Sequence, residues 1–189
     1  MGKSQYSDLR QKETKIKLIF ERATTHFRYR WGIREINKIL KTDRHLLNSE
    51  DILCSLGLLY DHLPSPKTSL RQRRQYEHKA LALYRRALKV NPKSPRATWG
   101  IGRVWWHRKD KRAIPYALRA YRFRNESGER PGLYAQNVGM VYEFLNDYKN
   151  AERWLLRGLK ENPHDFGSYL NLVVFYRLRY LLDFPYLQK

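Results

Sequence analysis

The sequence is poor in the residues that build disulfides and metal sites. Cys54 is the single cysteine among 189 residues, so no internal disulfide can form. A small secreted domain held together by disulfides is therefore excluded. The six histidines are scattered, and neither they nor Cys54 show the spacing of a zinc site. We expect no bound metal and no cofactor.

Long apolar runs and catalytic motifs are missing as well. The most apolar stretch, 170–182, is interrupted by Asn171, Arg177 and Arg179, so we expect no membrane-spanning helix. The sequence contains no phosphate-binding glycine loop, no nucleophile elbow and no zinc-protease motif. The first residues lack the apolar core of a signal peptide. These absences predict a non-enzymatic intracellular protein, soluble or bound in a complex, in the cytoplasm or inside an organelle, and not secreted.

Acidic side chains are few in comparison with basic ones. The chain carries 38 Lys and Arg against 18 Asp and Glu, a formal net charge of +20. Residues 131–189 contain 7 basic and 6 acidic residues, so almost all of the excess lies in 1–130. Such a charge exceeds what solubility requires. It indicates an acidic partner, which could be RNA, an acidic protein or an anionic membrane surface.

What the sequence does contain is a repeated pair of helices. Asn91-Pro92 and Asn162-Pro163 each end a helix-like stretch, because proline cannot continue a helix. Before Pro163, two amphipathic segments flank a turn at 146–148. Their characteristic residues are Val138, Gly139 and Tyr142 in the first segment and Ala151, Leu155 and Gly158 in the second. The small residues let two antiparallel helices approach closely, and the large ones fill the space between them.

The same pattern occurs in other parts of the chain. One earlier copy carries an 11-residue insertion near 62–78, and the last copy lacks its second helix. The copies comprise Leu53, Leu56, Gly57 and Tyr60 with Ala80, Tyr84, Ala87 and Pro92; Ile101, Gly102 and Trp105 with Ala113, Ala117 and Ala120; and Tyr169, Leu172, Val173 and Tyr176. Val173 follows Gly139 by 34 residues. Stacked copies of this length are expected to share one continuous core.

The pattern resembles the tetratricopeptide repeat (TPR), a helix–turn–helix motif in which small and aromatic positions recur every 34 residues. This resemblance implies an all-α fold, a right-handed superhelical solenoid of antiparallel helix pairs. About three and a half repeats would occupy 51–182, followed by an apolar tail at 183–189. Residues 1–50 would form a helical hairpin, which is either a degenerate first repeat or a plain hairpin. The first helix of each pair would line a concave groove.

Four residues of the middle copy are candidates for that groove. Their spacing of i, i+3, i+7 and i+10 places Arg96, Trp99, Arg103 and Trp106 on one helix face. Two indoles and two guanidiniums could hold an aromatic or acidic peptide, or stack unpaired bases. The alternative is that both tryptophans pack against a neighbouring helix and the arginines are merely solvated.

Two asparagines are further candidates for the groove. Asn137 and Asn171 hold equivalent positions 34 residues apart. The resemblance implies that asparagines at this position hydrogen-bond the backbone of a bound peptide, because an amide offers both a donor and an acceptor. Two asparagines that simply face solvent are the alternative.

Basic residues gather in two runs that suit phosphates. The candidate anion-binding or nucleic-acid-binding residues are Lys67, Arg71, Arg73, Arg74 and Lys79 in the first run and Arg108, Lys109, Lys111 and Arg112 in the second. A charge run can also be a solvated helix face. Two such runs within one third of the chain favour anion binding.

Two functions follow from these features. The first is a scaffold that binds a peptide or protein partner, for which the net charge favours an acidic one, in the concave groove as part of a multi-subunit assembly. The alternative is a basic, RNA-contacting component of a ribonucleoprotein such as a ribosome. The two are compatible, since one subunit can bridge protein and RNA.

Overall fold

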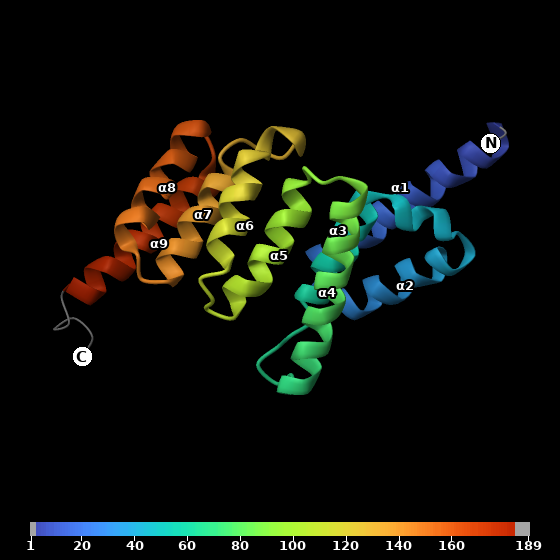
Figure 1. Ribbon diagram of the computed structural model, residues 1–189, viewed down its shortest axis with the longest axis horizontal. Helices are drawn as coiled ribbons and strands as arrows, with labels where there is room; N and C mark the ends of the chain where they lie inside the picture. The colour runs from blue at the N-terminus through green and yellow to red at the C-terminus, as the bar shows by residue number, and fades with distance from the viewer. Residues whose placement is uncertain (1–2, 184–189) are drawn as a thin grey trace. The chain divides into compact units, whose positions relative to one another are not determined.

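The computed structural model describes residues 3–183, with side chains described for 6–179, and these residues form helices joined by turns and loops (Figure 1). Nine α-helices and two 3-10 helices occur in that range, without a strand. They are α1 Lys3–Thr25, α2 Tyr29–Thr42, η1 Arg44–Asn48, α3 Glu50–Asp61, α4 Leu70–Val90, α5 Pro95–His107, α6 Ala113–Arg122, η2 Arg124–Glu126, α7 Leu133–Phe144, α8 Tyr148–Glu161 and α9 Phe166–Asp183. The predicted all-α fold is confirmed. None of the described helices is long and apolar enough to cross a membrane.

Helix ends follow from local side-chain chemistry. The carboxylate of Asp147 accepts a hydrogen bond from the backbone N–H of Asn150, and the Ser69 hydroxyl accepts one from Gln72, so both residues cap the start of a helix. Three turns between consecutive helices contain a residue in the left-handed region, namely Phe27, Lys109 and Asn146. The turns at Phe27 and Asn146 reverse the chain within a few residues, so short connections join α1 to α2 and α7 to α8.

The chain divides into two compact units, Met1–Val104 and Trp105–Lys189, with the boundary inside α5. The residues predicted as an insertion, near 62–78, lie in the connection 62–69 and the first turns of a long α4, and the insertion itself stays a prediction. The predicted division at residues 50 and 182 stays a prediction. Of the predicted apolar tail 183–189, only Asp183 lies within the described residues.

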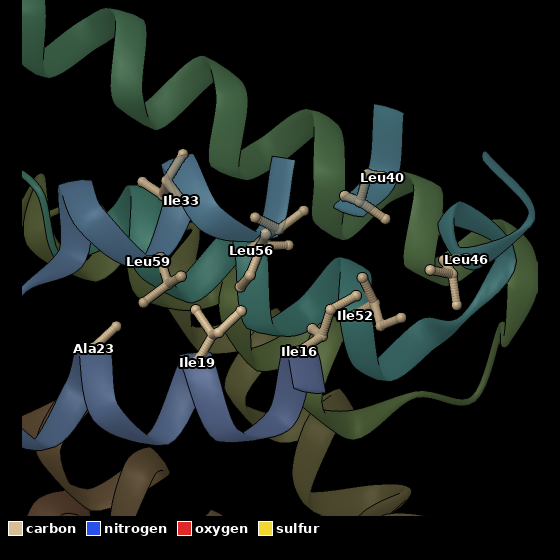
Figure 2. Close-up of a cluster of buried hydrophobic side chains, with 10 residues drawn as sticks. Ile16, Ile19, Ala23, Ile33, Leu40, Leu46, Ile52, Leu56 and Leu59 are labelled. Carbon is tan, nitrogen blue, oxygen red and sulfur yellow. The ribbon is translucent and has the colours of Figure 1, made fainter. Parts of the chain in front are cut away.

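The core of unit 1 joins α1, α2, η1 and α3. Its side chains are aliphatic, and Figure 2 shows those of α1 pointing toward α2 and α3. The buried members are Ile16, Ile19, Ala23, Ile33, Ile36, Leu40, Leu46, Ile52, Leu56 and Leu59. The N-terminal hairpin therefore shares its core with α3, as stacked helix pairs do.

Tyr84 of α4 fixes the spacing of three helices in unit 1. Its ring is buried, and a Cβ placed on Gly57 of α3 would come within 2.6 Å of the ring. A Cβ on Gly100 of α5 would come still closer to the same ring. The tyrosine thus occupies space that both glycines leave free, and a larger residue at either position would overpack the contact.

Unit 2 uses the same device between α7 and α8. A Cβ on Gly139 would come within 2.8 Å of Leu155, which is buried together with Ala151 at the α7–α8 contact. Gly132 has a φ of +82° directly before α7, and a Cβ there would collide with the carbonyl of Gly158. The small residues singled out in the sequence therefore lie where two backbones meet.

Substitution of Gly100 by alanine is expected to destabilise the chain. The added methyl clashes with a ring that already contacts Gly57, and overpacking of this kind costs about 1–3 kcal/mol, less the ~1 kcal/mol of helix propensity that alanine gains. Urea unfolding measures the net loss. In a Tyr84→Leu background the methyl has room, so Gly100→Ala should cost less there. An equal cost in both backgrounds would contradict the proposed contact.

Candidate functional site

The predicted groove residues on α5 of unit 1 differ in how far their side chains are exposed to a ligand. Arg103 Nε donates to Asp61 Oδ2 at 2.5 Å, and its Nη2 donates to the Tyr84 hydroxyl at 3.0 Å. The exposed fractions of the two ion-paired side chains are 14% for Arg103 and 3% for Asp61. The structure thus engages Arg103 within the protein, and its contact with a ligand stays a prediction. Its guanidinium compensates a buried carboxylate and links α5 to α3 and α4.

Arg96 lies on the open side of the same helix. Its Nη1 donates to Asp51 Oδ1 at 2.5 Å, and its side chain is 28% exposed. Arg96 also lines a hollow of about 290 Å³ between α1, α3 and α5. The hollow mixes charges of both signs: Glu13, Lys17, Glu21 and Asp51 line it together with Arg96. Sequence reasoning missed the contribution of α1, because only folding brings Glu13 and Lys17 next to α5.

The two predicted tryptophans are half-buried. Trp106 belongs to unit 2, where its ring centroid lies 5.6 Å from that of Phe144 in an edge-on arrangement and 5.1 Å from His107. This packing against another helix is the alternative to a groove role that the sequence left open for Trp106. Trp99 is partly exposed on α5 in unit 1 and stays a candidate.

The predicted asparagine pair in unit 2 is partly engaged within the protein. Asn171 Nδ2 donates to Gln136 Oε1 at 3.1 Å, whereas Asn137 is buried on α7. Gln136 is the centre of this network. It accepts a second hydrogen bond from Arg130 at 3.2 Å and donates to Asp165 and to Ser168. The buried amide thus ties α7 to the start of α9, a role that no sequence signal indicated.

Asp165 anchors the same network at the start of α9. Burial alone would raise the pKa of its carboxyl. Hydrogen bonds from Ser168, Gln136 and Arg130 outweigh burial and lower the pKa to about 2. One of these bonds comes from the backbone N–H of Ser168 at 2.7 Å, so Asp165 is also the N-cap of α9.

The outer face of α9 is a broad exposed apolar surface, which we call the α9 face. Leu172 and Phe175 of this helix are buried against α8, but seven large apolar side chains remain exposed. They are Phe166, Tyr169, Leu170, Val173, Val174, Tyr176 and Leu178. Contiguous apolar surface of this kind is uncommon on monomers and marks interaction sites.

The two predicted basic runs are arranged differently. In unit 1, Arg71, Arg74 and Lys79 line one surface hollow beside α4, Lys67 is exposed in the preceding connection, and Arg73 is half-buried.

In unit 2, the second run surrounds its own aromatic residues. Arg108 and Arg112 lie over the Trp105 ring at 5.2 and 3.7 Å, and Lys109 lies 5.2 Å from the centre of the Phe144 ring. Arg112 is also bonded to Asp110, whose pKa its hydrogen bonds lower to about 2. Lys111 is exposed. The first run is thus the more open cationic surface.

Metal-binding side chains do not cluster in the described part of the chain, and the single cysteine is buried. No cluster of three or more His, Cys, Asp and Glu side chains there could hold a metal ion. Cys54 is buried, and burial raises the pKa of its thiol to about 12. The thiolate, which is the nucleophilic form, is therefore negligible at neutral pH.

Removal of the Arg103 guanidinium is expected to be far more costly than removal of that of Arg96. Arg103→Leu leaves the carboxylate of Asp61 buried without its ion pair, which should lower the free energy of unfolding by about 3 kcal/mol. Arg96→Leu removes an exposed ion pair on the same helix and should cost less than about 1 kcal/mol. Urea titrations of both variants provide the comparison. Equal losses of unfolding free energy in the two variants would show that the ion pair of Arg103 contributes no more to stability than that of Arg96.

The low pKa of Asp165 predicts a loss of stability in acid. Because the folded-state pKa of about 2 lies below the ordinary value of 3.8, the contribution is complete above pH ~4 and disappears as the pH falls toward ~2. The stability gap between wild type and Asp165→Asn should therefore narrow over this range in urea titrations.

Asp147→Asn is the matched control for that experiment. Asp147 caps α8 in the same way, but it has no ion pair among the described residues. If the difference in unfolding free energy between wild type and Asp165→Asn stays constant down to pH ~2, the low pKa of Asp165 is contradicted.

Comparisons with solved structures support the helical architecture. The crystal structure of MamA aligns with a TM-score of 0.55 and 18% identity over 87% of this chain and 86% of that chain. The thermophilic TPR protein TTC0263 of Thermus thermophilus aligns with a TM-score of 0.65 and 16% identity over 92% of this chain and 94% of that chain. No protein-family model and no curated protein sequence matches the chain. At these identities the similarity concerns the fold, and the chain has the fold of a tetratricopeptide-repeat protein.

Proposed function

We propose that this chain is a non-enzymatic scaffold that binds a protein partner, with the α9 face as a docking surface for a partner helix. The observation that carries the proposal comes from the 34-residue period. Val173 and Tyr176 occupy the positions of Gly139 and Tyr142, which pack against Leu155 of the following helix. In α9 these two side chains are 61% and 45% exposed. Within the described residues, no helix fills beside α9 the place that α8 fills beside α7.

The chemistry of the α9 face suits a helix better than a charged ligand. Its side chains are aliphatic or aromatic, and the described helix carries only two charged residues with described side chains, Arg177 and Arg179. An amphipathic helix that places apolar residues at i, i+3, i+4 and i+7 could bury them there. Val173 is larger than the glycine at the equivalent position of α7. The incoming helix is therefore expected to lie somewhat farther from α9 than α8 lies from α7.

The predicted groove contributes a second element to this proposal. Arg96 lines the hollow beside α1 and α3, and Trp99 is partly exposed on the same helix, so these two residues are retained as peptide contacts in unit 1. Asn137 and Asn171 are retained on α7 and α9, where their positions flank the buried Gln136. Arg103 and Trp106 are assigned supporting roles, each within its own unit, through Asp61 and Phe144.

RNA contact is the second candidate function. The specific observation in its favour is that Arg71, Arg74 and Lys79 line one hollow of α4 without a carboxylate among its lining residues. Cations arranged in this way suit a phosphate backbone, and their contribution would fall steeply with salt concentration.

A photo-crosslinking experiment tests the α9 docking surface. A benzophenone amino acid at Val173 should give a covalent adduct with one partner protein in cells, because the side chain would lie within the interface. The same amino acid at Lys160, an exposed position of α8, is the control and should give none. The purified partner should then bind Val173→Asp at least about tenfold more weakly than wild type, because the carboxylate would be buried in an apolar contact.

The other outcomes of the experiment are decisive as well. Equal adducts at both positions, or normal binding to Val173→Asp, would reject the α9 face. If nuclease treatment of the lysate before irradiation prevents the adduct, the result would favour the ribonucleoprotein function. Circular dichroism of each variant checks that the helices are intact.

A further inference from the structure

A groove in unit 1 lies apart from the α9 face and shares only Lys79 with the α4 hollow of the RNA candidate. It runs between α2 and α4 over α3, with η1 at one end, and has a volume of about 850 Å³. Its base is apolar, formed by Leu40, Leu47, Leu56, Tyr60 and Leu83. We call it the α2–α4 groove.

The rim of the α2–α4 groove is cationic. Arg34, Lys38, Lys41, Arg44 and Lys79 line it, together with Asn37, and no carboxylate is among the lining residues. The carboxylate of Glu35 pairs with two of these cations, because its Oε1 lies 3.1 Å from both Arg34 Nε and Lys38 Nζ. Within the described part of the chain, Lys41, Arg44 and Lys79 have no carboxylate partner. Lys79 instead lies 5.3 Å from the centre of the Tyr60 ring.

We propose that the α2–α4 groove binds an acidic amphipathic helix of a partner protein, with the apolar side of that helix on the leucines and its carboxylates on the lysine and arginine rim. The lining residues of α2 extend from Arg34 to Lys41, about two helical turns or ~10 Å. A groove walled by two helices suits the helix-in-groove mode of recognition. The net charge of +20 steers an acidic segment toward this surface.

The apolar base argues against the other anionic partners. A phosphate backbone would use the cations and leave the leucines without contacts, whereas an amphipathic helix uses both. A lipid surface is broad and would meet the rim of the groove, while Leu40 and Leu56 are buried at its base. The combination of an apolar base with a basic rim therefore favours a protein helix.

This site is independent of the proposed α9 docking surface. Every lining residue belongs to unit 1, and none lies on α9 or α5. Loss of partner binding through Val173 would leave the α2–α4 groove intact, so the two proposals fail separately.

The test uses the full chain and a designed probe. The probe is a fluorescein-labelled synthetic peptide of about 16 residues with leucines on one helical face and glutamates on the other, long enough for partial helicity. A second peptide of the same composition, with leucines and glutamates rearranged so that no face is apolar, isolates the amphipathic contribution. Fluorescence anisotropy at about 0.15 M salt, where long-range charge effects are screened, measures the affinity of both.

Matched charge-reversal variants locate the binding. Lys41→Glu with Lys79→Glu should weaken binding of the amphipathic peptide at least tenfold, because both reversed charges face its carboxylates. Lys89→Glu with Lys93→Glu changes the net charge equally at exposed positions outside the groove and should alter binding by less than threefold. Unfolding curves check that all variants are folded.

Three results would overturn the proposal. One is equal affinity for the amphipathic and rearranged peptides, which would mean that only charge is recognised. A second is an equal loss in the two double variants. The third is that a single-stranded RNA displaces the peptide, and that Lys41→Glu with Lys79→Glu lowers the affinity for this RNA as much as the affinity for the peptide. That result would assign the rim to phosphates.

Discussion

Close contact between antiparallel helices is the constraint on which the rest of this structure depends. In unit 1 the ring of Tyr84 occupies the space beside Gly57 and Gly100, and in unit 2 Leu155 occupies the space beside Gly139. A helix pair joined in this way has little apolar surface of its own and must stack on its neighbours to complete a core. Within the described residues, the ion pair of Arg103 lies where such contacts are completed, and the α9 face lies where a stacked helix is not present.

Burial decides the roles of the polar residues. Arg96 and Arg103 are seven residues apart on the same face of α5, yet one lines a hollow at the surface and the other serves a buried carboxylate. Gln136, like Arg103, is engaged inside the protein. Its amide is hydrogen-bonded to Arg130, Asp165, Ser168 and Asn171, and these bonds hold the start of α9. Buried groups of this kind must be satisfied internally, which removes them from the surface available to ligands.

Charge and apolar surface are distributed unequally over the two units. Unit 1 presents cations around an apolar base in the α2–α4 groove, and unit 2 presents an almost uncharged face on α9. The first combination suits an acidic amphipathic helix and the second suits an apolar one, since charged rims supply specificity and steering while apolar contacts supply most of the affinity. One chain would in this way hold two different partner helices.

The sequence alone determined the helix pairs. The 34-residue spacing of Gly139 and Val173, the Asn-Pro stops and the small residues at 57, 139 and 158 are local or periodic features, and they predicted the helical-repeat fold that the structure has. Only the tertiary structure decided that Arg103 pairs with Asp61, that Gln136 is enclosed, and that Lys79 shares a groove with Lys41. The physical reason is that helical periodicity specifies which residues share a face, whereas these partners come from other helices and meet only when the pairs stack.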